Sequence, residues 1–136
     1  MRLIETDTIV AVASIGDRRH ERAVEIIRGD YGHLCVSPYA LIELDLLIQS
    51  GRIKVSNQLK FYDGLAELID YYDLEPLVPR PAYHAAASNL RRDNVELTFF
   101  DSLHAAVSIV EGAEMISFDR VYDRIGGIKR LRAEAQ

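Results

Sequence analysis

Short apolar runs alternate with longer helical patterns from one end of the chain to the other. Such alternation is typical of an α/β domain around a parallel sheet, because parallel strands need a long connection, usually a helix, between them. The length of 136 residues corresponds to one domain, which we place at residues 1–136. Strands are expected at 2–6, 33–37, 74–78, 114–118 and 127–131, with a brief extended piece at 95–98. Helices are expected at 7–15, 18–29, 38–51, 56–73, 80–94, 99–112 and, as a short one, 119–125.

Charge and cysteine content narrow the range of functions. The formal net charge of −5 argues against a passive nucleic-acid coat protein, which normally carries a basic excess, but not against an enzyme that contacts phosphates through bound metal. Cys35 is the only cysteine, which excludes an intramolecular disulfide framework and a cysteine-based zinc site. No apolar run approaches the roughly 20 residues that cross a membrane, and acidic residues interrupt the N-terminal stretch. We therefore expect a cytoplasmic protein without a membrane partner.

Two acidic residues directly follow expected strands. Asp7 comes after the strand at 2–6, and Asp119 comes after the strand at 114–118. Ligands of open α/β sheets collect beyond the carboxyl ends of the strands, so both side chains are expected at the same rim. Each residue also has a purely local explanation, because aspartate is a common N-cap of a following helix.

Asp101 lies near the start of an expected helix. Thr98 and Asp101 have the spacing of a capping box, in which the two residues satisfy each other's backbone amides. On a helical wheel, Asp101 shares a narrow stripe of mostly small residues with His104 and Ser108, which allows another backbone to come close. Capping and ligand binding are compatible for this residue.

Glu43 has the weakest local explanation of all the acidic residues. With Pro38 at the first helical position, Glu43 lies too deep in its helix to cap the N-terminus. Its neighbours three and four residues away are largely apolar, and a glutamate on such a face is rarely buried without a partner. The alternatives are a salt bridge, for instance with an arginine, and a side chain that extends into solvent. Asp123, in a charged segment, fits a solvated face better than a ligand.

These acidic side chains would repel one another strongly if they converged. Two carboxylates 4 Å apart repel by ~4 kcal/mol at an effective dielectric constant of about 20, so several such pairs require protonation or a cation between them. Oxygen ligands without cysteine or clustered histidine favour Mg²⁺ or Mn²⁺ over Zn²⁺. Such an ion orients and deprotonates water and offsets charge on a phosphodiester, which is nuclease chemistry. The candidate catalytic and metal-binding residues are Asp7, Glu43, Asp101 and Asp119.

Four motifs of the chain resemble those of the PIN-domain ribonucleases, which include the VapC-type toxins of prokaryotic toxin–antitoxin pairs. Each motif alone is weak, but the set is fairly specific in its order and separations and spans nearly the whole chain. The matching segments are ETDTIVAVAS with Asp7 and Thr8, VSPYALIELDLLI with Glu43, TFFDSLHAAVS with Asp101 and His104, and MISFDRVYDRIGGIKRL with Ser117 and Asp119.

The resemblance implies a three-layer α/β/α PIN-like fold with a central parallel β-sheet of about five strands. It also implies one or two Mg²⁺ or Mn²⁺ ions held by the four acidic residues, and hydrolysis of RNA by metal-activated water. Members of this family are commonly homodimers, and the toxins among them are blocked by a small antitoxin protein. Asp119 matches the last acidic position of the family better than Asp123, because Asp119 directly follows a strand.

Several further polar residues have both a catalytic and a structural explanation. His104 lies one turn after Asp101, where it either orients the Asp101 carboxylate or packs in the core. Thr8 and Ser117 either hold a metal-bound water or cap helices. Basic residues that fit either RNA contact or a solvated helix face are Arg18, Arg19 and Arg22.

Two functions compete on this basis. The first is a metal-dependent endoribonuclease, acting as the toxin of a toxin–antitoxin pair. The alternative is a catalytically weak PIN module that binds RNA or a partner protein and uses its acidic residues structurally. A third class, which takes phosphate on an aspartate, does not fit. Receiver domains need an early acidic pair and a late lysine, and aspartyl phosphatases need Asp-x-Asp after the first strand, where this chain has ETDT.

Overall fold

The computed structural model describes residues 1–132 and has a five-stranded sheet at its centre. The strand order is β3-β2-β1-β4-β5, and every neighbouring pair is parallel. All five expected strands are present, although they are shorter than predicted. No strand forms at 95–98. Residues 95 and 96 form a turn in which the Leu97 amide donates to the Asn94 carbonyl, and the backbone is extended at Thr98, the N-cap of the next helix. The strands are β1 (Arg2–Ile4), β2 (Leu34–Val36), β3 (Glu75–Pro76), β4 (Glu114–Ser117) and β5 (Arg130–Arg132).

The helices occur in the predicted order with shifted ends. The third begins later than expected because residues 37–39 form a turn before Ala40. The sixth is capped at its C-terminus by Gly112, whose φ of 64° lies in the left-handed region that favours glycine. The helices are α1 (Thr6–Ala13), α2 (His20–Gly29), α3 (Ala40–Gln49), α4 (Gln58–Tyr71), α5 (Pro81–Asp93), α6 (Phe99–Glu111) and the 3₁₀ helix η1 (Arg120–Arg124).

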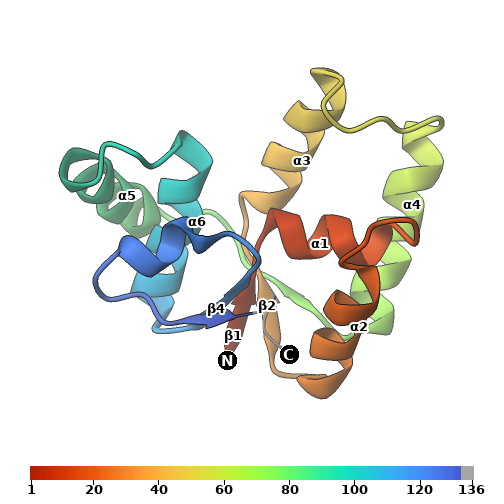
Figure 1. Cartoon of the computed structure of the whole chain (residues 1–136), viewed down its shortest axis with the longest axis horizontal. Helices are drawn as coiled ribbons and strands as arrows, with labels where there is room; N and C mark the ends of the chain where they lie inside the picture. The colour runs from red at the N-terminus through yellow and green to blue at the C-terminus, as the bar shows by residue number, and fades with distance from the viewer. Residues whose placement is uncertain (133–136) are drawn as a thin grey trace.

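Alternating side chains of the central strands divide the interior into two cores. Ile4 and Ile116 belong to a core with residues of α1, α2, α3 and α4. Leu3 and Met115, their neighbours in sequence, belong to a second core with residues of α5 and α6. Figure 1 shows the sheet between these two groups of helices. The three-layer α/β/α prediction is confirmed.

The carboxyl ends of the strands determine where the chain can build a site. After β1 the chain enters α1, after β2 it turns into α3, and after β4 it enters η1. The first turns of α1, α3 and α6 approach one another above this edge of the sheet (Figure 1). Helices of the described region are all too short or too polar to cross a membrane.

Candidate active site

Glu5 lies at the centre of the site, although the sequence analysis overlooked it. It follows β1 directly and is the N-cap of α1, where its side chain accepts a hydrogen bond from the Asp7 amide at 3.2 Å. Only 5% of Glu5 is exposed. Ser117, at the end of β4, donates its hydroxyl to Glu5 Oε1 at 3.2 Å. The explanation of Asp7 as the cap of this helix is therefore wrong, because Glu5 has that role.

The surroundings of Glu5 disfavour its ionised form. Burial raises the pKa of Glu5 well above its usual range, and the neighbouring carboxylates of Asp7 and Glu43 raise it further. A cation between these groups would offset both effects, since it would replace the lost hydration and reverse the sign of the nearest charge. The position of Glu5 is therefore one where a bound cation would be favourable.

Glu43 reaches from α3 toward α1 and α6. Its Oε1 accepts a short hydrogen bond from the Thr6 hydroxyl and lies 2.8 Å from His104 Nε2. Burial alone would raise the pKa of Glu43, but the hydrogen bonds from His104 and Thr6 and the attraction of His104 lower it below its usual value. Its partner is therefore a histidine rather than the arginine considered from the sequence.

His104 is fully buried beneath the site. Its Nδ1 lies 2.7 Å from the Ser37 hydroxyl, and its Nε2 lies 2.8 Å from Glu43 Oε1 and 3.9 Å from Glu5 Oε2. The expectation that His104 orients Asp101 is wrong, because both ring nitrogens are engaged by residues of other elements. We call Glu5, Glu43 and His104 the inner cluster.

Asp7 lies beside the inner cluster and is half-buried. Its Oδ2 accepts hydrogen bonds from the Ser117 hydroxyl at 3.1 Å and from the Phe118 amide at 3.0 Å. Thr8 donates its hydroxyl to Asp7 Oδ1 at 3.1 Å and also contacts the Ile116 carbonyl. Thr8 and Ser117 thus orient the Asp7 carboxylate and tie α1 to the end of β4.

Asp101 combines a capping role with a position at the site. Thr98 and Asp101 form the predicted capping box, in which Asp101 Oδ2 accepts from the Thr98 amide at 3.2 Å. The other oxygen, Oδ1, lies 3.5 Å from the Tyr122 hydroxyl. The Asp101 carboxylate therefore caps α6 with one oxygen and approaches Tyr122 in the site with the other.

Asp119 is the most exposed acidic residue of the set. Its amide donates to the Ser117 hydroxyl at 3.0 Å, and its Oδ1 caps η1 by accepting from the Val121 amide at 2.9 Å. The capping explanation is correct here, and the residue is exposed. We call Asp7, Asp101 and Asp119 the outer rim. Asp123 is bound instead by Arg130, whose Nε and a terminal nitrogen lie 2.9 and 2.8 Å from its carboxylate.

Acidic residues from separate parts of the chain lie around the hydroxyl of Tyr122. This side chain is completely buried, and its hydroxyl lies 3.4 Å from Glu5 Oε2. Burial raises the pKa of Tyr122 far above its usual value, and surrounding carboxylates raise it further. Those carboxylates belong to Glu5, Asp101, Asp7 and Asp119. Residues from three separate segments of the chain therefore face a single hydroxyl.

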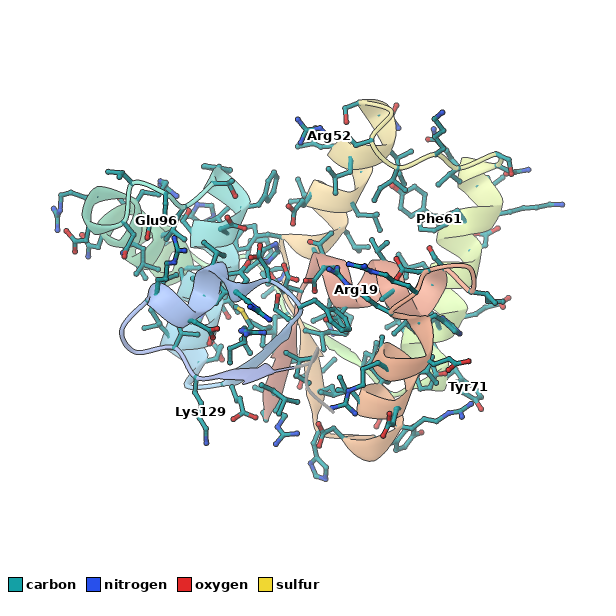
Figure 2. All side chains as sticks on the ribbon, viewed as in Figure 1. Arg19, Arg52, Phe61, Tyr71, Glu96 and Lys129 are labelled. Atoms are coloured by element: carbon teal, nitrogen blue, oxygen red, sulfur yellow. The ribbon has the colours of Figure 1, made fainter. Side chains whose placement is uncertain are left out.

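The basic candidates differ in their relation to the site. Arg19 is nearest, because its guanidinium lies 5.0 Å from the centre of the Phe118 ring, next to Asp119 in the sequence. Figure 2 shows Arg19 among the side chains near the middle of the molecule. Arg18 is exposed, and Arg22 lies 3.3 Å from Glu25 on the same helix.

A hollow of about 360 Å³ opens beside Glu43. It lies between α3 and the start of α6, and Arg52, Thr98 and Phe100 contribute to its wall. Figure 2 shows Arg52 beyond the far end of α3, on the side of that helix that faces α6. A cation, an aromatic ring and one residue of the inner cluster, Glu43, thus share one opening.

The donor atoms of the inner cluster fit a divalent ion. One carboxylate oxygen each of Glu5 and Glu43 and one nitrogen of His104 all lie within 4.8 Å of one another. The three side chains come from β1–α1, α3 and α6, so only the folded chain assembles them. The sequence analysis named Glu43 as a metal ligand but placed its partners at the outer rim.

The chain also matches a known protein family. The model of the PIN domain matches residues 3–128, which is nearly the whole chain. No curated protein of known function matches the chain in sequence.

Several solved structures share the fold. The structure of VapBC2 from Rickettsia felis, bound to a DNA fragment from their promoter, is 15% identical with a TM-score of 0.71, and the match covers 96% of each chain. A toxin–antitoxin complex from Klebsiella pneumoniae is 13% identical with a TM-score of 0.67, covering 94% of this chain and 95% of the other. FitAcB from Neisseria gonorrhoeae is 16% identical with a TM-score of 0.68, and both chains are covered completely.

Proposed function

The chain belongs to the PIN domain family, whose members are in general metal-dependent nucleases, and on that premise we propose that it is a Mg²⁺- or Mn²⁺-dependent endoribonuclease. We further propose that it acts in the cytoplasm as the toxin of a toxin–antitoxin pair. The convergence of acidic side chains around Glu5 and Tyr122 carries this proposal, because a buried group of carboxylates is stable only with protons or cations between its members.

In the proposed site, Glu5 and Glu43 would hold one or two divalent ions together with the carboxylates of the outer rim. When bound, such an ion lowers the pKa of water and stabilises charge on a phosphodiester. The protein contributes the orientation of its ligands. Thr6 fixes one oxygen of Glu43, and Ser117 and Thr8 fix the two oxygens of Asp7. The Asp119 carboxylate is exposed, so it is the ligand best placed to meet an incoming substrate.

Three observations around the site support a nucleic-acid substrate. Arg52 and Phe100 line the hollow beside Glu43, and Arg19 lies over the ring of Phe118, which precedes Asp119 in the sequence. Arginine binds phosphate and aromatic rings stack on unpaired bases, which is how proteins hold single-stranded RNA. These basic groups also offset the repulsion between the carboxylates and the phosphate backbone.

Two protein partners belong to the proposal, namely a small antitoxin and a second copy of the chain. An exposed apolar surface on α3 supports a protein partner, since Leu41, Ile42 and Leu46 are 42, 50 and 54% exposed. Co-expression with the product of a neighbouring short reading frame, followed by mass measurement of the purified complex, distinguishes the antitoxin from a second copy.

Incubation of the purified protein with single-stranded RNA tests the proposed activity. We expect cleavage with Mn²⁺ or Mg²⁺, loss of cleavage with a chelator, and loss in the variants Asp7→Asn and Asp101→Asn. His84→Gln, which changes a residue outside the site that contacts Tyr39, is the matched control and should cleave normally. Tight RNA binding without cleavage at any metal concentration would instead favour the alternative, a catalytically weak PIN module that binds RNA or protein.

A further inference from the structure

His104 presents one ring nitrogen to the inner cluster. The ring belongs to α6 and is fully buried, so the side chains packed around it fix its position. Nε2 lies 2.8 Å from Glu43 Oε1 and 3.9 Å from Glu5 Oε2. Phe100, one turn earlier on the same helix, has its ring centre 6.5 Å from that of His104 and covers it on one side.

The spacing of these atoms matches that of neighbouring ligands around one ion. Metal–nitrogen and metal–oxygen bonds of about 2.1 Å at right angles place adjacent donor atoms about 3 Å apart. The 2.8 Å between His104 Nε2 and Glu43 Oε1 is close to that value. Glu5 Oε2, at 3.9 Å from Nε2, needs only a small side-chain movement to join them.

Ser37 supplies the partner that a ligating histidine requires. A metal-bound imidazole nitrogen must carry a lone pair, so the proton resides on the other nitrogen and is donated to a fixed acceptor. The Ser37 hydroxyl lies 2.7 Å from Nδ1, and it can accept as well as donate. With the ion absent, Nε2–H donates to Glu43. With the ring proton on Nδ1 and donated to Ser37, the lone pair of Nε2 is free for an ion that takes the place of that proton beside Glu43.

We propose that His104 is a ligand of the divalent ion, so that the inner cluster is a mixed nitrogen–oxygen site that prefers a first-row transition ion such as Mn²⁺ over Mg²⁺. This inference rests on the proposed metal-dependent function and specifies its ion. Imidazole binds transition ions well and Mg²⁺ poorly, because Mg²⁺ prefers oxygen ligands and retains its waters. A site built from carboxylates alone would lack that discrimination.

Electron spin echo spectroscopy of bound Mn²⁺ tests the ligand directly. Wild-type protein with natural-abundance nitrogen should show ¹⁴N coupling to Mn²⁺, and protein grown with ¹⁵N-labelled histidine should show the ¹⁵N pattern in its place. The coupling should vanish in His104→Gln and persist in His84→Gln. This measurement on the wild-type chain needs no variant, so it remains decisive if His104→Gln does not fold.

Calorimetric titration provides the second readout. His104→Gln should weaken Mn²⁺ binding about 10–100-fold and Mg²⁺ binding much less, so the ratio of the two affinities should shift toward Mg²⁺. Mn²⁺ that binds without histidine coupling, or equal losses for the two ions, would overturn the inference and leave the proposed nuclease intact. Absence of any Mn²⁺ or Mg²⁺ binding by the wild-type protein would overturn both.

Discussion

The inner cluster and the outer rim are neighbouring groups of acidic residues in very different environments. Glu5 and Glu43 are removed from most of the solvent, and their pKa values shift in opposite directions because one faces other carboxylates and the other faces His104. The rim residues Asp7 and Asp119 are held by backbone amides and remain accessible. The inner cluster is therefore suited to hold an ion, and the outer rim to meet the substrate.

Removal of an inner carboxylate should have the largest effect. Glu5→Gln or Glu43→Gln should reduce RNA cleavage on the order of 10³-fold, because either change removes charge from the position where the ion is held. Cleavage rates under single-turnover conditions at saturating RNA measure this effect, with His84→Gln as control. If both variants retained more than about a tenth of the wild-type rate, the inner cluster would not be the catalytic centre.

Removal of the exposed rim carboxylate of Asp119 should have a smaller effect. Asp119→Asn should lower cleavage about 10–100-fold while Mn²⁺ affinity at the inner cluster changes little, because the exposed Asp119 side chain contributes after the ion is bound. Parallel titrations and cleavage assays separate the two quantities. Equal loss of ion affinity in Asp119→Asn and Glu43→Gln would contradict the division into cluster and rim.

The pH dependence of stability should distinguish the two inner glutamates in the absence of metal. The folded-state pKa of Glu5 is raised above 4.5, so its contribution is fully present below pH 4.5 and is lost as pH rises through the folded-state value. The pKa of Glu43 is lowered, so its contribution is present above pH 4.5 and is lost as pH falls through its folded-state value.

Glu5→Gln should therefore stabilise the metal-free protein at pH 7 by roughly 1–2 kcal/mol while it inactivates the enzyme. Denaturant unfolding in chelator between pH 5 and 8 measures this difference. The free energy of unfolding of the wild type should fall as the pH rises, and it should fall less in Glu5→Gln. Addition of Mn²⁺ should abolish this pH dependence in the wild type. If the free energy of unfolding changed with pH in the same way in the wild type and in Glu5→Gln, Glu5 would not titrate between these pH values.

Substitution of Arg52, which lines the hollow beside Glu43, should affect RNA binding more than the rate of cleavage. Arg52→Gln should weaken the binding of single-stranded RNA several-fold. It should also lower the slope of log affinity against log salt concentration by about one, because one phosphate contact is lost. Fluorescence anisotropy with chelated metal measures binding without cleavage. Arg28→Gln, on the exposed end of α2, is the matched control for loss of one positive charge. An equal effect of both substitutions would mean that the charge acts at long range and not in the hollow.

Substitution of Asp123 should have the smallest effect on RNA cleavage. Because Arg130 binds its carboxylate, Asp123→Asn should leave cleavage within about twofold of the wild type. It should reduce stability by about 1–3 kcal/mol, because Arg130 is buried and loses the charge of its partner. A loss comparable to that of Asp119→Asn would assign Asp123 to the rim. Cleavage rates of the two variants, measured side by side, decide between these positions.

The fold was largely predictable because its signals are local. Alternating strand and helix patterns, the capping box of Thr98 and Asp101 and the terminal Gly112 all depend on residues within a few positions of one another. The site was predictable only in part. Asp7, Asp101 and Asp119 follow strands or begin helices, which marks them in the sequence.

The inner cluster depends on contacts that no local pattern contains. Glu5 was overlooked because the first strand was expected to extend past it and because glutamate is an unusual N-cap. Its burial arises from Ser117 and Tyr122, more than 100 residues away. The direction of His104 toward Glu43 likewise depends on how α3 and α6 meet. The signal that could have revealed Glu5 is its position directly after the first apolar run, which corresponds to that of Asp119.

Anomalous diffraction from crystals grown with Mn²⁺ tests the central claim most directly. We predict a strong peak within bonding distance of Glu5, Glu43 and His104, with any second ion on the side of Asp7 and Asp119. Manganese bound only at the exposed rim, with Glu43 and His104 still hydrogen-bonded to each other, would contradict the account.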